Sequence, residues 1–442
     1  MHRREFIGAV GGVAALGFAE AAFAASSDLE ADARNAWLYV LPLIEMAAAR
    51  IRMTDMSRPG QHAGLSVFRH AEKLVGPEDR GITTPNNDTL YSNSFIDLTK
   101  GPLTLTVPKA GSRYLSVAVM DMFTNNNVIL GARTPGGAAG TWRLIGPDMN
   151  PTGPRDLQIK TPHAWVLSRV LLDGLPDMAA AQTVQHAVTL SGPKAAKPRV
   201  YAHRDAPWSA YFQSAAGLLQ SEGTGTAPAG LAAFERVKNA GRRQDFAASG
   251  YSAADAAAIA KGVESARKIV ETAADHVSFI DGWSYPKPDL GDYGDDYIYR
   301  AIIAVAGLGA LTRPEAMYMR AASEDGSPLF KGDGLYRLNL PKPIPVNSFW
   351  SLTMYEATKD GQYFLTENVL HRYAIGDRTP GLKKNADGSV DIWIGRQDPG
   401  GERTSNWLPA PKTGPFSLTM RAYLPKPEMQ DLTYHLPPVT KV

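Results

Sequence analysis

The chain has 442 residues, of which 44% are hydrophobic and 20% charged, and its formal net charge is +2. This near-neutral balance, without a basic run, gives no electrostatic footprint for nucleic acid or for an anionic membrane surface. The sequence contains no cysteine, which excludes disulfides and thiol chemistry. The 41 glycines and 32 prolines favour many turns between short strands.

Residues 1–24 have the pattern of an export signal. Arg3-Arg4-Glu5-Phe6-Ile7 precedes a weakly apolar stretch, and Ala22-Phe23-Ala24 supplies a small-residue cleavage site. The paired arginines favour the twin-arginine type, and an ordinary secretory signal is the alternative. We expect the mature chain to begin near Ala25 and to work in the periplasm or outside the cell. No later apolar run approaches the roughly 20 residues of a membrane-spanning helix, so a soluble mature protein is expected.

The first part of the chain, residues 28–175, is predicted to form a mixed module with an antiparallel sheet. Apolar residues recur at helical spacing between residues 28 and 51, and Pro42 is expected to kink or divide that helix. Short strands are predicted over residues 103–107, 114–120 and 169–172.

The middle segment, residues 176–325, is predicted to be mainly helical. Its helices are expected over residues 231–238, 252–274 and 296 to about 322. Gly307 and Gly309 weaken the pattern of the last helix.

Strand patterns return in the last segment, residues 326–442. They cover residues 336–340, 348–355, 371–375, 390–394 and 416–423, with turn signals between them. We therefore expect a C-terminal antiparallel β-sandwich, jelly-roll-like, within an α+β chain.

Familiar catalytic signatures are absent from the sequence. It contains no G-x-S-x-G elbow, H-E-x-x-H helix, Walker loop or complete G-x-G-x-x-G fingerprint. The common hydrolase, zinc-peptidase and nucleotide-binding templates are therefore unsupported.

Two polar clusters carry the chemistry that the sequence does offer. Residues 83–92 gather amides, a carboxylate and hydroxyls, and residues 121–127 form a second group of this kind. Their oxygens are hard ligands, suited to a divalent cation or to the hydroxyls of a sugar-like ligand. The alternative is that the Asn and Asp side chains satisfy the backbone of their own turns.

Aromatic and basic residues near the C-terminus are further candidates for a binding site. They lie in Arg372-Tyr373 and in the segment 406–411, which contains Trp407. Such rings can offer a flat binding face, and an arginine can hold a carboxylate. They can equally close the edge of a core.

Ordered motifs in both halves resemble a known bacterial pair of modules. The N-terminal module resembles domain of unknown function 1254 in Pro85-Asn86-Asn87-Asp88-Thr89-Leu90-Tyr91-Ser92, Asp97-Leu98, Gly101-Pro102, Val107-Pro108, Arg113-Tyr114 and Asp121-Met122-Phe123-Thr124. The C-terminal module resembles domain of unknown function 1214 in Phe349-Trp350-Ser351-Leu352-Thr353-Met354-Tyr355, Arg372-Tyr373, Asp387-Gly388-Ser389, Asn406-Trp407-Leu408-Pro409-Ala410-Pro411 and Pro415-Phe416. The resemblance implies an exported protein with a mixed N-terminal module, a helical middle and a C-terminal β-sandwich, and it transfers no catalytic residue.

Polar clusters on both modules point to a ligand site between them, because domain interfaces are where such sites tend to form. We expect an enzyme, a hydrolase that acts on a small or oligomeric polar molecule, with Asp88 or Asp121 as general base or cation ligand. The candidate ligand-binding residues are Asn86, Asn87, Tyr91, Arg113, Tyr355, Arg372 and Trp407. One alternative is a non-catalytic binding protein for a sugar, lipid or aromatic metabolite, and a further one is a structural envelope protein.

Overall fold

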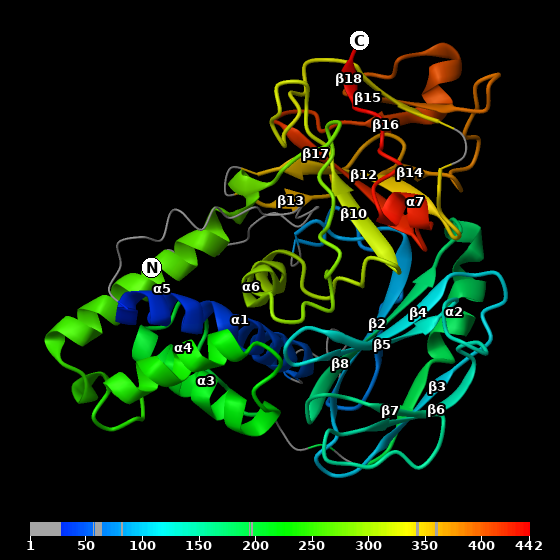
Figure 1. Ribbon diagram of the computed structural model, residues 1–442. Coiled ribbons are helices and arrows are strands. Elements are labelled where there is room, and N and C mark those ends of the chain that lie inside the picture. The colour runs from blue at the N-terminus through cyan, green and yellow to red at the C-terminus, as the bar shows by residue number, and fades with distance from the viewer. Residues whose placement is uncertain are drawn as a thin grey trace.

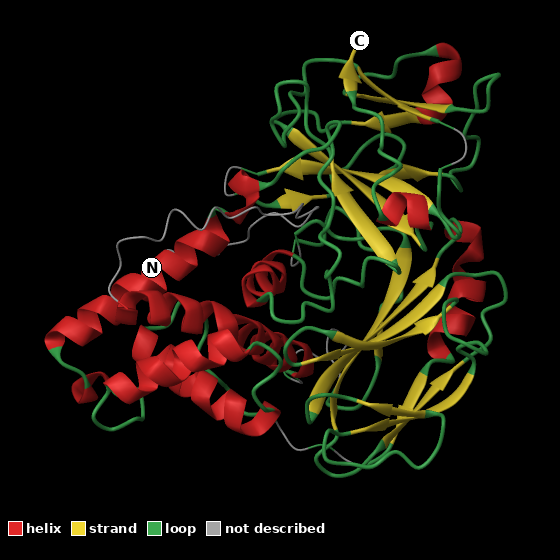
Figure 2. Cartoon of the chain, viewed as in Figure 1, coloured by secondary structure: helices red, strands yellow, loops and turns green. Residues whose placement is uncertain are grey.

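The computed structural model describes residues 28–442 except 56, 58–63, 81–82, 194, 196–197, 342–343 and 359–360. The predicted export signal lies outside the described residues. Figure 1 shows a helical bundle beside an N-terminal group of strands, with a C-terminal group of strands above them. Figure 2 shows that most helices gather on one side of the strands. This arrangement confirms the predicted α+β class with a helical middle and C-terminal sheets.

The N-terminal strands form two sheets packed face to face. The first has the order β1 (Arg69–His70), β2 (Thr89–Asp97), β8 (His163–Leu171), β4 (Leu115–Asp121) and β5 (Asn126–Gly131). The second has the order β7 (Asp156–Gln158), β6 (Gly140–Ile145), β3 (Leu103–Val107) and β9 (Thr189–Ser191). Leu90, Val166 and Leu105 belong to the core between them. Helix α2 (Met178–His186) follows a short 3-10 turn, Leu175–Asp177, and packs against β2 and β8.

The second face of the first sheet turns toward the bundle and the C-terminal module. Because side chains alternate along a strand, the antiparallel register of β2 and β8 places Tyr91 opposite Arg169 and Asp97 opposite His163 on this face. Between these polar ends, the rings of Phe95 and Trp165 stack 5.6 Å apart and join the core of the bundle.

Helix α1 (Asp28–Thr54) is the central element of the bundle and packs against the four other long helices. These are α3 (Trp208–Glu222), α4 (Pro228–Ala240), α5 (Ala253–Glu271) and α6 (Tyr297–Ala306). Short 3-10 turns cover Ala248–Gly250 and Ala273–His276. Helix α1 continues through Pro42 and is not divided there. None of the helices in the described part of the chain is long and apolar enough to cross a membrane.

The helix predicted to run from residue 296 to about 322 is wrong in its second half. Helix α6 ends at Ala306, Gly307 follows as its C-cap, and Gly309 adopts a φ of +90°. A non-glycine residue rarely adopts that conformation, so the chain turns away from the helix there. Residues Ala316–Arg320 instead form strand β10, which pairs with β17.

The C-terminal strands also form two sheets. The first contains β10 (Ala316–Arg320), β17 (Phe416–Tyr423), β12 (Trp350–Ala357) and β13 (Tyr363–Phe364), with β14 (Ala374–Gly376) paired to β12. The second has the order β16 (Trp407–Pro409), β15 (Val390–Gly395), β11 (Tyr336–Leu340) and β18 (Thr440–Lys441). A 3-10 turn, Gly401–Asn406, and a short helix, α7 (Pro427–Gln430), complete the module.

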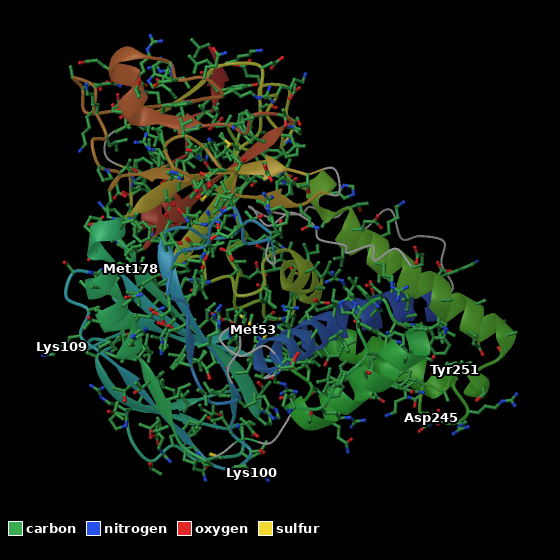
Figure 3. All side chains as sticks on the ribbon, turned by 180° about the vertical axis from the view of Figure 1, so that it is seen from behind. Met53, Lys100, Lys109, Met178, Asp245 and Tyr251 are labelled. Carbon is green, nitrogen blue, oxygen red and sulfur yellow. The ribbon has the colours of Figure 1, made fainter. Side chains whose placement is uncertain are left out.

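The view from behind in Figure 3 places Asp245 and Tyr251 at the tip of the bundle and Lys100 at the far end of the N-terminal strands. The region where the two groups of strands meet lies away from these labelled extremities.

Candidate functional site

One face of the first C-terminal sheet is polar although it is buried. In β17, Leu418 and Met420 point into the apolar core between the C-terminal sheets, whereas Arg421 and Tyr423 point to the opposite face. The polar face consists of Tyr318, Arg320, Ser351, Thr353, Tyr355, Ser417, Thr419, Arg421 and Tyr423. All of these residues are buried except Tyr318, which is half-buried. Buried polar groups need hydrogen-bond partners. The N-terminal module, which packs on this face, supplies several of them.

The segment 83–88 of the N-terminal module lies across this polar face. The Tyr355 hydroxyl donates to the carbonyl of Pro85 at 2.7 Å, and Arg421 Nη2 donates to the carbonyl of Thr84 at 3.2 Å. The Ser351 hydroxyl donates to Asp88 Oδ2 at 2.7 Å. Each contact joins residues more than 260 positions apart in the sequence, so the segment fastens one module to the other.

Asn86 stands at the centre of these contacts. Its Nδ2 donates to the hydroxyl of Tyr423 at 2.8 Å and to the hydroxyl of Tyr91 at 3.1 Å. Its Oδ1 accepts the backbone N–H of Asp88 at 2.6 Å, as in an Asx turn. The Nδ2 end of the amide therefore contacts two tyrosines from different modules, while its Oδ1 end fixes the turn that carries it.

Arg169 approaches Tyr91 from the neighbouring strand. Its Nε donates to the Tyr91 hydroxyl at 3.1 Å, and its Nη2 donates to the carbonyl of Gly309 at 2.6 Å. Its Nη1 is buried and has no hydrogen-bond partner among the described residues. We call the set Asn86, Asp88, Tyr91, Arg169, Tyr318, Ser351, Tyr355, Arg421 and Tyr423 the junction site.

The tyrosines of the junction site differ in acidity. Burial raises the pKa of Tyr355 and of Tyr423. Burial acts on Tyr91 in the same direction, but the charge of Arg169 and the hydrogen bonds from Arg169 and Asn86 outweigh it and lower its pKa. Environments that push the pKa values of neighbouring groups apart are typical of acid–base sites.

Two of the tyrosines retain contact with solvent. Tyr91 and Tyr318 are half-buried, while Arg169 and Arg421 beside them are only 5% and 4% exposed. The junction site is therefore in contact with solvent at these two tyrosines, and the two charged guanidinium groups lie deeper.

Four of the residues predicted from sequence meet at this site, namely Asn86, Asp88, Tyr91 and Tyr355. Asn87 belongs to the same segment, and its Nδ2 donates to the carbonyl of Val75 at 2.5 Å, which anchors the segment to the N-terminal module.

Asp121 lies in a separate network. Its Oδ1 accepts the backbone N–H groups of Phe123 and Asn125, both at 2.9 Å, and its Oδ2 accepts Nδ2 of Asn127 at 2.8 Å. Burial nevertheless raises the pKa of this carboxyl, against the effect of these donors. Asn125 in turn accepts a hydrogen bond from the buried Arg300 of α6 at 3.4 Å, so the turn connects the N-terminal sheet to the bundle.

Arg372 and Trp407 lie within the C-terminal module. Arg372 Nη1 donates to the carbonyls of Ser405 and Trp407, at 3.0 and 2.8 Å. The indole of Trp407 donates to the carbonyl of Gly395 at 2.8 Å. These bonds fix the chain around the 3-10 turn at Gly401–Asn406 and bring neither side chain to the junction site.

Arg113 is held by the N-terminal module. It forms a two-nitrogen ion pair with Asp177, with Nη2 and Oδ1 2.6 Å apart, and Nη1 also donates to the carbonyl of Leu171 at 2.7 Å. The hydrogen bond from Arg113 holds the pKa of Asp177 below its ordinary value.

The ion pair makes a pH-dependent contribution to stability. Because the folded-state pKa of Asp177 is depressed, the contribution is present above the ordinary aspartate pKa of about 4 and is lost as the pH falls through the lower folded value. We expect Asp177→Asn to lower the free energy of unfolding by about 0.5 kcal/mol at pH 7, allowing for solvent screening. Urea unfolding of both proteins at pH 7 and pH 3 checks this, and an equal difference at both values would contradict it.

Sequence reasoning missed Arg169, Tyr318, Arg421 and Tyr423 as site residues. The signal for the last two was present, because polar residues at every second position of β17 oppose an equally regular apolar series. A strand whose alternate residues are polar is ordinarily read as solvated on that side. Only the packing of the N-terminal module shows that this face is covered.

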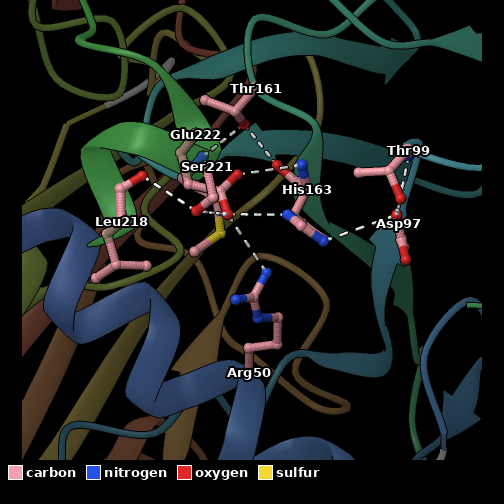
Figure 4. A network of polar contacts seen from close by, with 9 residues as sticks. Arg50, Asp97, Thr99, Thr161, His163, Leu218, Ser221 and Glu222 are labelled. Carbon is pink, nitrogen blue, oxygen red and sulfur yellow. Dashed lines mark hydrogen bonds and ion pairs between the residues drawn. The ribbon is translucent and has the colours of Figure 1, made fainter. Parts of the chain in front are cut away.

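A second polar network lies at the other end of the same N-terminal face (Figure 4). His163 Nδ1 lies 2.8 Å from Glu222 Oε1 of α3, and its Nε2 lies 3.7 Å from Asp97 Oδ1. Arg50 of α1 lies 3.6 Å from the same Glu222 oxygen. Both ring nitrogens of His163 face carboxylates, so the network joins the bundle to the N-terminal sheet.

The part of the chain that the structure describes contains no cluster of ligands for the divalent cation that the sequence suggested. Across the described ranges, no group of three or more histidine, aspartate or glutamate side chains is placed to hold a metal ion. Asp88 Oδ2 accepts the Ser351 hydroxyl, and both oxygens of Asp121 accept the protein donors given above.

Two family models match the chain, in the order that the sequence motifs predicted. Residues 65–192 match the model described as protein of unknown function (DUF1254), and residues 315–427 match the model described as protein of unknown function (DUF1214). No curated protein matches the chain.

Among solved structures, the VPA0106 protein from Vibrio parahaemolyticus is similar over 94% of this chain and 100% of its own, with a TM-score of 0.67 and 19% identity. At this identity the likeness shows the fold. An uncharacterized protein from Burkholderia cenocepacia aligns over 88% of this chain and 84% of its own, with a TM-score of 0.42 and 12% identity.

Proposed function

The chain belongs to the two-module DUF1254–DUF1214 proteins, and we propose that it is an enzyme in which Tyr91, at the junction of the modules, exchanges a proton with a small polar substrate. The observation that carries the proposal is the environment of the Tyr91 hydroxyl. It accepts hydrogen bonds from Arg169 and Asn86, at 3.1 Å each, on a half-buried side chain.

These two donors favour the phenolate form of Tyr91. A buried phenol ordinarily keeps its proton, because the charged form is poorly solvated in the interior. Here Arg169 and Asn86 replace that solvation, and the lowered pKa of Tyr91 brings its ionisation closer to neutral pH. A group whose pKa approaches the working pH can both give and take a proton during a reaction.

Hydrolysis is the reaction class that we propose for this arrangement. A water molecule would attack the substrate, the bond to the leaving group would break as Tyr91 protonates that group, and the proton that the water loses would return to Tyr91. The guanidinium of Arg169 would stabilise negative charge that develops on a substrate oxygen. Asn86 positions the Tyr91 hydroxyl by a hydrogen bond. The hydrogen bond between Asp88 and Ser351 joins the two modules beside Tyr91. The site draws residues from both family modules, so neither module alone would assemble it.

The place of action that we propose is the periplasm or the exterior of the cell. The support for it is the sequence of residues 1–24, with its paired arginines and small-residue cleavage site. N-terminal sequencing of the protein from fractionated cells tests this, and full-length protein retained in the cytoplasm would contradict it.

Tyr91→Phe tests the proposed chemistry because it removes the hydroxyl and keeps the ring. We expect wild type to turn over at least one of a panel of nitrophenyl esters, phosphates and glycosides, and the variant to lose roughly 100-fold or more in kcat. Tyr373→Phe is the matched control, since its hydroxyl contacts Glu367 on the exposed side of the C-terminal module.

Thermal unfolding of each variant accompanies the kinetics, so that loss of structure is separated from loss of chemistry. Full turnover in folded Tyr91→Phe would remove Tyr91 from the mechanism. Saturable binding of a substrate analogue without turnover by wild type would replace the enzyme with a binding protein.

A further inference from the structure

Each module contributes one buried arginine to the junction site, Arg169 from β8 and Arg421 from β17. Neither forms an ion pair with a carboxylate among the described residues, and Asp88 is the one acidic member of the junction site. Burial disfavours a charged guanidinium, but neighbouring tyrosines outweigh this and raise the pKa of both arginines. Two positive charges therefore face one negative charge.

The hydrogen bonds of the two arginines are unequal. Arg421 is engaged, with Nη1 donating to Thr353 at 2.7 Å and Nη2 to the hydroxyl of Tyr355 at 2.7 Å. Arg169 uses Nε and Nη2, while its buried Nη1 has no partner among the described residues. A buried charged donor without an acceptor is costly, so this nitrogen marks a place where an acceptor is strongly favoured.

We propose that the junction site binds the carboxylate of a small organic acid, with Arg169 Nη1 as the direct donor and Arg421 as a second positive charge nearby. The inference rests on the proposed function for its location, and it names the substrate class that the same site would take.

The number of free donors favours a carboxylate over a phosphate. One nitrogen of Arg169 is unpartnered, whereas a phosphate dianion would call for several additional donors around its oxygens. A carboxylate carries a single charge, which matches the excess of one positive charge in the junction site.

The residues around the two arginines favour an acid whose other part, beyond the carboxylate, is apolar. Half-buried Tyr318 packs against an apolar cluster that contains Tyr114, Leu311 and Phe349. The ring of Tyr423 lies 4.1 Å from that of Phe349 and 5.1 Å from that of Tyr114. These aromatic neighbours make a planar, apolar ligand with one anionic end, such as an aromatic acid, the first class to test.

Anion binding would also act on Tyr91. In the free protein the charge of Arg169 lowers the pKa of Tyr91. A bound carboxylate would offset that charge and let the pKa of Tyr91 rise toward its ordinary value, which favours the protonated hydroxyl. The substrate would thereby prepare the proton donor that the proposed reaction uses.

Benzoate and benzamide provide the test, because they differ in charge and not in shape. We expect benzoate to raise the melting temperature of wild type by about 2 °C at saturating concentration, and benzamide to leave it unchanged. Arg169→Gln should weaken benzoate binding about tenfold or more in calorimetry, whereas Arg337→Gln, which changes an arginine paired with Asp391 at the other C-terminal sheet, should not. Equal effects of benzoate and benzamide, or a response to inorganic phosphate alone, would overturn the proposal.

A second measurement needs no variant at the site. Wild type crystallised with 4-bromobenzoate should show the carboxylate within hydrogen-bond distance of Arg169 Nη1, and the bromine signal elsewhere would overturn the proposal. Tyr91→Phe separates the two proposals, because it should bind benzoate while it lacks turnover. Benzoate binding that depends on Arg169, together with full turnover in Tyr91→Phe, would keep the carboxylate site and remove the proposed chemistry.

Discussion

Asp121→Ala is expected to lower the free energy of unfolding by about 4 kcal/mol. The carboxylate is 1% exposed and accepts hydrogen bonds from Phe123, Asn125 and Asn127. Removing it leaves these buried donors without an acceptor, and each unsatisfied group costs roughly 1–3 kcal/mol. Arg300 also loses a nearby negative charge, which at present opposes the effect of its burial.

The measurement is urea unfolding at neutral pH, followed by fluorescence. Asp121→Asn should cost about half as much, because one amide oxygen can still accept the two backbone N–H groups. Asp148→Ala is the matched control, since Asp148 is exposed, and it should change stability by less than about 0.5 kcal/mol. A wild-type-like midpoint in Asp121→Ala would show that the turn does not depend on its carboxylate.

The same variant separates two roles of Asp121. If the carboxylate acted only as a catalytic base, its removal would abolish turnover and leave the fold intact. The contacts of the turn, which reach Tyr293 and Arg300 through Asn125, instead predict that stability falls first. Loss of turnover with an unchanged melting temperature would restore Asp121 as a catalytic candidate.

Gly262→Ala is expected to lower the free energy of unfolding by about 2–3 kcal/mol. Gly262 lies in α5 where it crosses α1, and an added Cβ would stand 2.2 Å from the carbonyl oxygen of Glu30 and 2.8 Å from Cβ of Ala33. The first of these atoms is backbone, so the two helices must move apart. Their separation would loosen the core around α1, which is the centre of the bundle.

Helix propensity by itself predicts that Gly262→Ala raises the free energy of unfolding. Alanine in a helix interior is favoured over glycine by about 1 kcal/mol. Gly217→Ala in α3 isolates that term, because the nearest atoms to its added Cβ are 3.6 and 3.9 Å away. We expect Gly217→Ala to raise the melting temperature slightly and Gly262→Ala to lower it. A rise in both would mean that α1 and α5 tolerate the extra methyl group.

Local pattern was sufficient for much of the fold. Strands β3, β11 and β17 lie where alternation placed them, and α5 begins directly after its N-cap Ser252, whose hydroxyl accepts the backbone N–H of Asp255. These elements depend on side-chain period and on capping, which are properties of neighbouring residues. The ordered motifs also identified both modules correctly, although they carried no chemistry with them.

The error at α6 shows where local pattern stops being sufficient. Ala316–Arg320 contains residues that suit a helix, but pairing with β17 gives the segment hydrogen bonds and a buried position that an isolated helix would lack. Strand pairing across about 100 residues of sequence cannot be read from the segment itself. Tertiary context therefore overrode its local preference.

By itself the sequence determined the composition class, the absence of thiol chemistry, the order of the modules and the candidates Asn86, Asp88, Tyr91 and Tyr355. Only the tertiary structure decided that Arg169 and Arg421 contact this group, and that Arg113, Asp121, Arg372 and Trp407 lie elsewhere. The physical reason is that charge and hydrogen-bond environment depend on spatial neighbours. A guanidinium acts on a phenol a few ångströms away, whatever the number of residues that separates them along the chain.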